Sequence, residues 1–196
     1  METKRSELIS KIQTTCRDLF LWGLIDSHSG NVSVRRGKNI LIKKTGAQLR
    51  HFSKNDFVEF PLKAASHPAA SSDFLTHRKI YLEVPQAQAI LHAHPPIAVS
   101  LSLFMDWIET VDLEGNYYLP RIPVISVDYQ TYAEDTRKKL PAILKKYPVA
   151  IIRGHGSFAR GKDLDEALKW TTLVEQVSKI YFYTHCLKKL GLSLKG

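Results

Sequence analysis

Three histidines in this chain have the spacing of metal ligands. His92 and His94 stand on either side of one alanine at the end of a short apolar run, and His155 follows later between two glycines. In an extended strand, residues two apart point to the same face, so the first two imidazoles can converge on one point. Three neutral imidazoles with a fourth position left for solvent or substrate are typical of a catalytic zinc site. The pattern therefore predicts metal chemistry.

A structural role for these histidines is the alternative. A His-x-His pair also arises by chance, and a histidine on a half-buried strand is more often hydrogen-bonded in the core or at the surface than bound to a metal. Gly154 and Gly156 favour the metal, because glycines on both sides of His155 permit an unusual backbone path and the close approach of another group. We therefore predict that His92, His94 and His155 are metal ligands.

Small polar residues at three other places could bind an anion. The pairs are Gly30 with Asn31, Thr45 with Gly46, and Ser71 with Ser72. The two serines precede a predicted helix, where free backbone N–H groups and the helix dipole favour negative charge. Each pair taken alone fits an ordinary turn or helix cap. Only their combination with the three histidines indicates a site.

The composition indicates a globular protein. The chain has 196 residues, of which 44% are hydrophobic and 24% charged, so it can bury a sizeable core, and we expect one domain over residues 1–196. No apolar stretch is long enough to span a bilayer, and the first residues lack the apolar segment of a signal peptide. Cys16 and Cys186 match no metal or redox spacing, which favours reduced thiols. We therefore expect a cytoplasmic protein with no membrane partner.

The chain is basic, with a formal net charge of +9. Such a charge suits a nucleic-acid binder, but the lysines are dispersed over several predicted helices, and no basic strand is interleaved with aromatic residues. A positive field attracts small anionic metabolites such as sugar phosphates equally well. We expect a small-molecule partner and no nucleic acid, although charge alone does not decide between them.

Hydrophobic periodicity and turn residues predict alternating helices and strands. We expect helices over residues 6–21, from 71–73 to Pro85, over 97–104, from Thr131 onward, and over 163–190. Strands are expected over residues 31–35, 40–43, 57–60, 92–94, 124–127 and 149–152. Residues 105–118 give no clear prediction.

The connections between these elements indicate the fold class. Hairpins outnumber strand–helix–strand units in the first half of the chain, so we predict an α/β protein with a central, mainly antiparallel or mixed β-sheet flanked by helices. Thr131 with Glu134 predicts a reciprocal capping box at the start of a helix, and Pro141 predicts that this helix is interrupted or restarted.

Five blocks of the sequence, in order, resemble the class II aldolase/adducin family. They are Ser29-Gly30-Asn31-Val32-Ser33-Val34-Arg35, Lys44-Thr45-Gly46-Ala47, Ser71-Ser72-Asp73 with His77 and Ile80-Tyr81, His92-Ala93-His94, and Gly154-His155-Gly156 with Phe158 and Gly161. The family contains L-fuculose-phosphate aldolases, L-ribulose-5-phosphate 4-epimerases and adducin-like interaction proteins. The resemblance covers nearly the whole chain and implies the three-layer fold of the family.

The resemblance also implies a cofactor, a ligand set and an assembly. Zn²⁺ or another divalent metal ion would be bound by His92, His94 and His155. The phosphate of a small-molecule sugar phosphate would be held by Asn31, Thr45, Gly46, Ser71 and Ser72. Subunits would form a homo-oligomeric ring, commonly a tetramer.

Asp73 bears on which of the family's activities is present. In the aldolases the matching block usually ends in a glutamate that acts as acid/base, whereas the 4-epimerases carry an aspartate there as a metal ligand. The epimerase pattern also places a catalytic aspartate where this chain has Asn116, which cannot transfer a proton; Asp112 or Glu114 is a candidate substitute. We expect Asp73 to be catalytic in a metal-dependent aldehyde-lyase that cleaves a ketose 1-phosphate to dihydroxyacetone phosphate and an aldehyde by retro-aldol chemistry. A 4-epimerase and a non-catalytic interaction domain are the alternatives.

Overall fold

The computed structural model describes residues 2–65 and 67–194. The helices are α1 (Glu2–Leu21), the short 3-10 helix η1 (Lys54–Asp56), α2 (Phe74–Glu83), α3 (Pro96–Ser102), α4 (Leu113–Tyr118), α5 (Tyr132–Leu144) and α6 (Leu164–Lys189). The strands are β1 (Asn31–Arg36), β2 (Asn39–Lys43), β3 (Phe57–Pro61), β4 (Ala89–Ala93), β5 (Trp107–Glu109), β6 (Arg121–Ile125), β7 (Val149–Ile152) and β8 (Gly156–Gly161).

The described strands form one eight-stranded sheet in the order β3-β2-β1-β4-β8-β7-β6-β5. Strands β6 and β7 are parallel, and the other neighbouring pairs are antiparallel. The predicted fold class, an α/β protein with a mainly antiparallel or mixed sheet, is confirmed.

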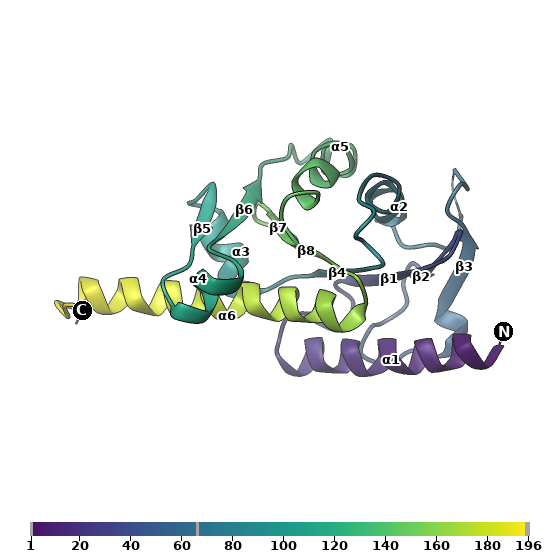
Figure 1. Ribbon diagram of the computed structural model, residues 1–196, viewed down its shortest axis with the longest axis horizontal. Helices are drawn as coiled ribbons and strands as arrows, with labels where there is room; N and C mark the ends of the chain where they lie inside the picture. Colours follow the sequence, from purple (N-terminus) through teal and green to yellow (C-terminus); the bar gives the residue numbers. More distant parts are fainter. Residues whose placement is uncertain (1, 66, 195–196) are drawn as a thin grey trace.

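Helices cover both faces of the sheet and give three layers. Helices α1 and α6 lie on one side, and α2 and α5 lie on the other (Figure 1). Strand β4 shows why: Ile90 packs with residues of α2 and α5, whereas its neighbour Leu91 packs with residues of α1. Both residues are fully buried, and burial of each such side chain is worth about 1.5–3 kcal/mol. The central strands are therefore apolar on both faces.

The register of the central strands brings distant residues to one face. Asn31 of β1 lies opposite His92 of β4, and His92 in turn lies opposite Phe158 of β8. His92 shares the strand face of Ile90, which is the face covered by α2 and α5. The polar side chains of β1 and β4 are thereby directed toward the start of α2.

Several local expectations were wrong. Thr131 occupies the cap position of α5 but its side chain makes no capping hydrogen bond, because its backbone (φ −110°, ψ 18°) is not extended. Pro141 lies inside α5 without breaking it; the buried proline removes one backbone hydrogen bond near the end of the helix. Strand β6 begins at Arg121, before the predicted start, since Pro123 is tolerated where β6 pairs with the short edge strand β5.

Other predictions agree with the structure. Helix α1 ends at Leu21, and α2 ends before Pro85. The stretch that gave no clear prediction contains β5 and α4. Cys16 is buried and Cys186 half-buried, and both are free thiols. None of the described helices combines the length and the apolar character needed to cross a membrane.

Candidate active site

Three imidazoles meet at the end of the central strands. His92 lies in β4, His94 follows the last residue of that strand, and His155 lies in the turn between β7 and β8. The Nε2 atom of His92 lies 3.0 Å from Nε2 of His94 and 3.2 Å from Nε2 of His155. Among the described residues these three side chains form the group able to share one ion, with ligand atoms within 4.8 Å of one another.

The ring of His92 is oriented by two contacts. Its Nδ1 hydrogen-bonds the Ser157 carbonyl oxygen at 2.9 Å, and Phe158 stacks on the ring with centroids 4.1 Å apart. Because a carbonyl accepts only, Nδ1 carries the proton and Nε2 presents its lone pair to the other two imidazoles. A ligating histidine is commonly held in this way by a backbone carbonyl.

The three imidazoles are electrostatically suited to a cation. Burial lowers the pKa of His92 well below 6.5, and it also lowers the pKa of His94 and of His155. Neighbouring imidazoles lower the first two pKa values further, because two positive rings would repel each other. The rings are therefore neutral near pH 7, which is the form that binds metal. Three converging neutral nitrogens fit a divalent ion such as Zn²⁺.

The two glycines beside His155 have different roles. Gly154 has φ +67°, a left-handed conformation that favours glycine. At Gly156, an added Cβ would lie 2.5 Å from the Ala93 carbonyl oxygen and 2.7 Å from His94 Cδ2. One glycine thus permits the turn and the other permits the close approach of strand and imidazole.

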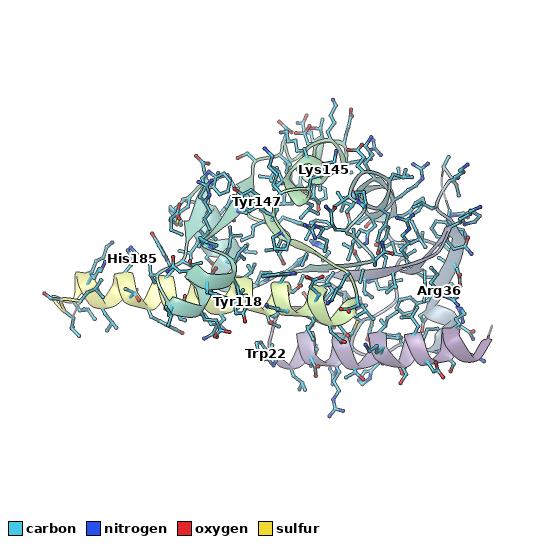
Figure 2. The ribbon with its side chains drawn as sticks, viewed as in Figure 1. Trp22, Arg36, Tyr118, Lys145, Tyr147 and His185 are labelled. Atoms are coloured by element: carbon cyan, nitrogen blue, oxygen red, sulfur yellow. The ribbon has the colours of Figure 1, made fainter. Side chains whose placement is uncertain are left out.

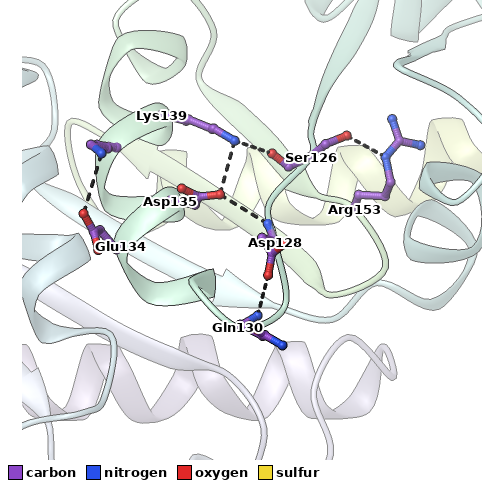
Figure 3. Close-up of polar contacts among 8 residues, drawn as sticks. Ser126, Asp128, Gln130, Glu134, Asp135, Lys139 and Arg153 are labelled. Atoms are coloured by element: carbon purple, nitrogen blue, oxygen red, sulfur yellow. Dashed lines mark hydrogen bonds and ion pairs between the residues drawn. The ribbon is translucent and has the colours of Figure 1, made fainter.

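Arg153 anchors the turn that carries His155. Its Nε donates to Ser126 Oγ at 2.9 Å, as Figure 3 shows, and its guanidinium also donates to the Ser102 carbonyl oxygen. Lys139 of α5 donates to the Ser126 carbonyl oxygen at 2.9 Å. These bonds connect the turn to the end of α3 and to the segment after β6, and that segment is in turn bonded to α5.

Glu175 holds the segment that follows His94 in the chain. This buried carboxylate of α6 accepts hydrogen bonds from the backbone N–H groups of Ile97 at 3.1 Å and Ala98 at 3.2 Å. These groups belong to the first turn of α3, three residues after His94. Burial raises the pKa of Glu175, and the two N–H groups oppose that rise because they stabilise the charged form.

Asp73 lies at the start of α2 beside the three imidazoles. Its Oδ2 accepts a hydrogen bond of 2.6 Å from Asn31 Nδ2, and its side chain caps no backbone N–H group. Asn31 Oδ1 is buried and has no hydrogen-bond partner among the described residues. The carboxylate is thus held by an amide, outside the group of three histidines.

A buried polar network supports this end of α2. Ser33 Oγ is hydrogen-bonded with His77 Nδ1 at 2.7 Å and with the Tyr81 hydroxyl at 2.8 Å. The backbone N–H of His77 donates to the Asp73 carbonyl oxygen at 3.0 Å. Burial lowers the pKa of His77 to about 3, so its imidazole is neutral. The network couples β1 to the helix turn that presents Asp73.

All nine residues that the sequence predicted for the site line one cleft of about 270 Å³. They are Asn31, Thr45, Gly46, Ser71, Ser72, Asp73, His92, His94 and His155. Within the cleft, Ser71 N–H donates to the Lys43 carbonyl oxygen at 2.9 Å, and the Thr45 hydroxyl donates to the Ala70 carbonyl oxygen at 2.6 Å. These bonds hold the two predicted anion-binding loops together.

Gly30, which the sequence pairs with Asn31, also lines the cleft. Three lining residues were missed by sequence reasoning: His28, Lys43 and Tyr132. The Tyr132 ring lies 4.7 Å from the His155 ring, and its hydroxyl is buried with no hydrogen-bond partner in the described part of the chain. Nothing in the spacing of Tyr132 relates it to the histidines. Lys43 carried one signal, a charged residue at the end of a strongly apolar strand.

Asp112 and Glu114, the candidate substitutes for a proton carrier, do not line this cleft. Asp112 instead caps α4, accepting a hydrogen bond of 2.8 Å from the Gly115 N–H. Glu114 lies exposed in the first turn of the same helix. Within one copy of the chain, neither can transfer a proton to a molecule in the cleft.

The chain is similar to known proteins along most of its length. A family model described as "Class II Aldolase and Adducin N-terminal domain" matches residues 10–182. An L-fuculose phosphate aldolase of Methanocaldococcus jannaschii is 29% identical over 180 residues, covering 89% of this chain and 95% of that protein. A methylthioribulose-1-phosphate dehydratase of Acidiphilium cryptum is 28% identical over 160 residues, covering 73% of this chain and 74% of that protein.

A solved structure shares the architecture. The L-fuculose-1-phosphate aldolase of Thermus thermophilus superposes with a TM-score of 0.90 and 32% sequence identity, covering 96% of this chain and 100% of that one. The segment matched by the family model contains every residue that lines the cleft, from His28 to His155.

Proposed function

This chain belongs to the class II aldolase and adducin family, and from this premise we propose that it is a metal-dependent sugar-phosphate aldolase. The reaction is cleavage of a ketose 1-phosphate of the L-fuculose 1-phosphate type to dihydroxyacetone phosphate and an aldehyde. One observation carries the proposal: three neutral imidazoles converge in a cleft that small polar donors also line.

His92, His94 and His155 are the proposed metal ligands, and Zn²⁺ is the proposed ion, although nitrogen ligands suit several divalent metals. Bound there, the ion would supply Lewis-acid stabilisation of the negative charge that develops on the substrate oxygens. The Ser157 carbonyl supports this role, because it fixes the proton of His92 on the nitrogen that faces away from the other imidazoles.

Asp73 is the proposed proton-transfer residue. Cleavage of the bond between C3 and C4 leaves an electron pair on C3, which must gain a proton to give dihydroxyacetone phosphate, while the C4 hydroxyl loses one to give the aldehyde. The Asp73 carboxylate would take up a proton to replace the one it delivers to C3, and the C4 hydroxyl releases one proton in the same turnover, so the reaction needs no net acid. Its hydrogen bond from Asn31 and its place outside the group of three histidines favour this role over metal ligation.

The phosphate is proposed to lie against Asn31, Thr45, Gly46, Ser71 and Ser72. The hydroxyl of Thr45 already donates to Ala70, so this residue serves mainly to hold the loop that presents Gly46. Ser71 is buried in the cleft and Ser72 is exposed at its edge. Together they give the substrate neutral hydrogen-bond donors of the kind found at phosphate sites.

An epimerase acting on L-ribulose 5-phosphate is the second candidate, favoured by one observation. Position 73 holds an aspartate, which is one methylene shorter than the glutamate usual in the aldolases. An epimerase would rejoin the two carbon fragments after the bond between them is broken, so that neither fragment is released. A non-catalytic interaction domain is disfavoured, because it would have no need of the three converging histidines.

The test of the function is a product assay on metal-loaded protein. L-Fuculose 1-phosphate and L-ribulose 5-phosphate are incubated separately, and dihydroxyacetone phosphate and pentulose 5-phosphate epimers are measured. Dihydroxyacetone phosphate from the first substrate is the expected result, together with its loss after chelation and its return with a divalent metal. A new pentulose 5-phosphate without triose would replace the aldolase by the epimerase. Elemental analysis of the purified protein identifies the ion.

We further propose that the chain assembles with copies of itself, as a tetramer, in the cytoplasm. Large apolar side chains are exposed at the end of the molecule formed by α3, α4 and the last turns of α6: Phe104, Leu113, Tyr117, Phe182, Tyr183, Leu187 and Leu190. Figure 2 shows His185 on the part of α6 that extends beyond the sheet. Exposed apolar surface of this kind favours a protein interface. Light scattering coupled to size exclusion measures the number of subunits.

A further inference from the structure

A second cavity lies beside α1, the helix that is separated from α2 and α5 by the sheet (Figure 1). It measures about 450 Å³, and ligand pockets commonly measure about 300–1,000 Å³. We call it the α1 cavity; its walls are Gln13, Arg17, Phe20 and Leu21 of α1 and residues 50–52 of the loop after β2. No described residue lines both the α1 cavity and the cleft. The α1 cavity is therefore a separate candidate site.

The two walls of the α1 cavity are fixed to each other. Gln13, Arg17 and Phe20 lie on one side of α1, because residues three and four apart share a helix face. Gln13 Nε2 donates to the Phe52 carbonyl oxygen at 3.1 Å, which holds the loop against the helix. The Phe52 ring packs edge-on against Phe57 of β3, with ring centroids 4.9 Å apart. The loop wall is thus anchored both to α1 and to the sheet.

Two guanidinium groups in the α1 cavity lack acidic partners. In the described part of the chain, no ion pair joins Arg17 or Arg50 to a carboxylate, and no acidic residue lines the cavity. Asp18 lines a different cavity, between α1 and α6. Asp56 accepts hydrogen bonds from Ser53 at the start of η1. The positive charge in the α1 cavity is therefore uncompensated and attracts an anion.

Aromatic rings lie beside this charge. Arg50 Cζ lies 4.8 Å from the centroid of the Phe20 ring, which is a cation–π contact. Phe20 and Phe52 are half-buried, so each keeps part of its surface open to a ligand. A guanidinium group pairs with phosphate or carboxylate through two N–H groups and also stacks on flat rings. Charge and rings together fit a ligand that carries both an anionic group and a planar ring.

We propose that the α1 cavity binds a nucleoside monophosphate. Arg17 and Arg50 would hold the phosphate, which carries about −1.5 to −2 charges at pH 7 and so matches two guanidinium groups, whereas a carboxylate would neutralise only one. His51 is exposed in the same wall and would add an N–H donor. The base would stack on Phe20 or Phe52, since every base has a flat face. This site is independent of the reaction proposed for the cleft.

The first experiment is calorimetric titration of the metal-loaded protein with adenosine monophosphate, adenosine and ribose 5-phosphate. Adenosine monophosphate should bind at least about 10-fold more tightly than either fragment, because each fragment keeps only one of the two kinds of contact. Ribose 5-phosphate bound as tightly as adenosine monophosphate would contradict the role of the rings. No binding of adenosine monophosphate would overturn the proposal.

Substitution of the arginines tests their role. Arg17→Gln and Arg50→Gln should each weaken the binding of adenosine monophosphate about 10- to 100-fold, because hydrogen bonds between charged groups are lost. Both arginines are exposed, so the variants should fold as the wild type does. Arg121→Gln is the matched control: Arg121 is also exposed and stacks on a ring, with Cζ 4.3 Å from the Trp107 centroid, but does not line the α1 cavity. Wild-type affinity in Arg50→Gln, or an equal loss in Arg121→Gln, would refute the assignment.

Hydrogen exchange of the unmodified chain locates the bound nucleotide. Adenosine monophosphate should slow amide exchange over residues 13–21 and 50–52 and leave residues 92–94 and 153–156 unchanged. The reverse pattern would place the nucleotide in the cleft and overturn the proposal. Light scattering of the same variants tests a second copy of the chain as the occupant. A changed number of subunits in Arg50→Gln, with unchanged nucleotide affinity, would make the α1 cavity a contact between copies instead.

Discussion

Replacing Gly156 by alanine tests whether the three imidazoles converge because Gly156 packs closely against them. An added Cβ would lie 2.5 Å from the Ala93 carbonyl oxygen, 2.7 Å from His94 Cδ2 and 3.0 Å from His92 Cε1, against 3.4–4 Å for ordinary contact. The carbonyl belongs to a strand paired on both sides and cannot swing away. Strand β8 or the two imidazoles must therefore shift by about 1 Å.

This shift is large for a metal site, because ligand distances are held to within about 0.2 Å. We expect Gly156→Ala to weaken Zn²⁺ binding about 10- to 100-fold, as measured by competition with a chromophoric chelator. The free energy of unfolding of the metal-free protein should fall by about 1–3 kcal/mol in urea denaturation, which is the usual cost of overpacking. Wild-type zinc affinity in Gly156→Ala would refute the reasoning.

Gly23→Ala is the control for a general loss of stability. Gly23 has φ +68°, and a Cβ there would meet nothing within 4 Å. The left-handed conformation costs alanine about 1–2 kcal/mol, so the unfolding free energy should fall as in Gly156→Ala. The affinity for zinc should remain that of the wild type, because Gly23 does not line the cleft.

Two further changes probe the groups around the imidazoles. Asp73→Asn should lower turnover about 100- to 10,000-fold while the metal content by elemental analysis stays normal; near-normal turnover would remove Asp73 from the mechanism. His77 stays neutral in the folded protein, with its pKa lowered to about 3 by burial, but binds a proton below pH 6.5 in the unfolded chain. Stability is therefore lost as the pH falls from 6.5 toward 3, and His77→Gln should flatten this dependence by about 1.4 kcal/mol per pH unit in urea denaturation of the metal-free protein. An unchanged slope would show that His77 is not buried as described.

Local sequence patterns predicted that the three histidines converge, because the spacing that brings them together is largely local. His92 and His94 lie two apart at a strand end, and the glycines around His155 mark a turn and a close approach. Patterns of this kind depend on backbone geometry that neighbouring residues determine. The fold class likewise followed from local signals, the turn residues and hairpins of the first half of the chain.

Residues brought in by long-range pairing could not be predicted locally. Tyr132 reaches the cleft because Arg153 and Lys139 tie the turn and α5 to the segment after β6. Lys43 could be placed in the cleft only once the partner of β2 was known. The capping box at Thr131 failed for a similar reason, since backbone conformation there is decided by the loop as a whole rather than by residue types.

The three imidazoles come from segments that meet only when β4 pairs with β8, more than sixty residues along the chain. An unfolded chain therefore offers no assembled chelate, and a cation that binds the native form alone shifts the folding equilibrium by mass action. At a free concentration of about 1,000 times the dissociation constant, this linkage amounts to about 4 kcal/mol. The melting temperature of the protein would then depend on the concentration of the free ion as well as on the packing of the core.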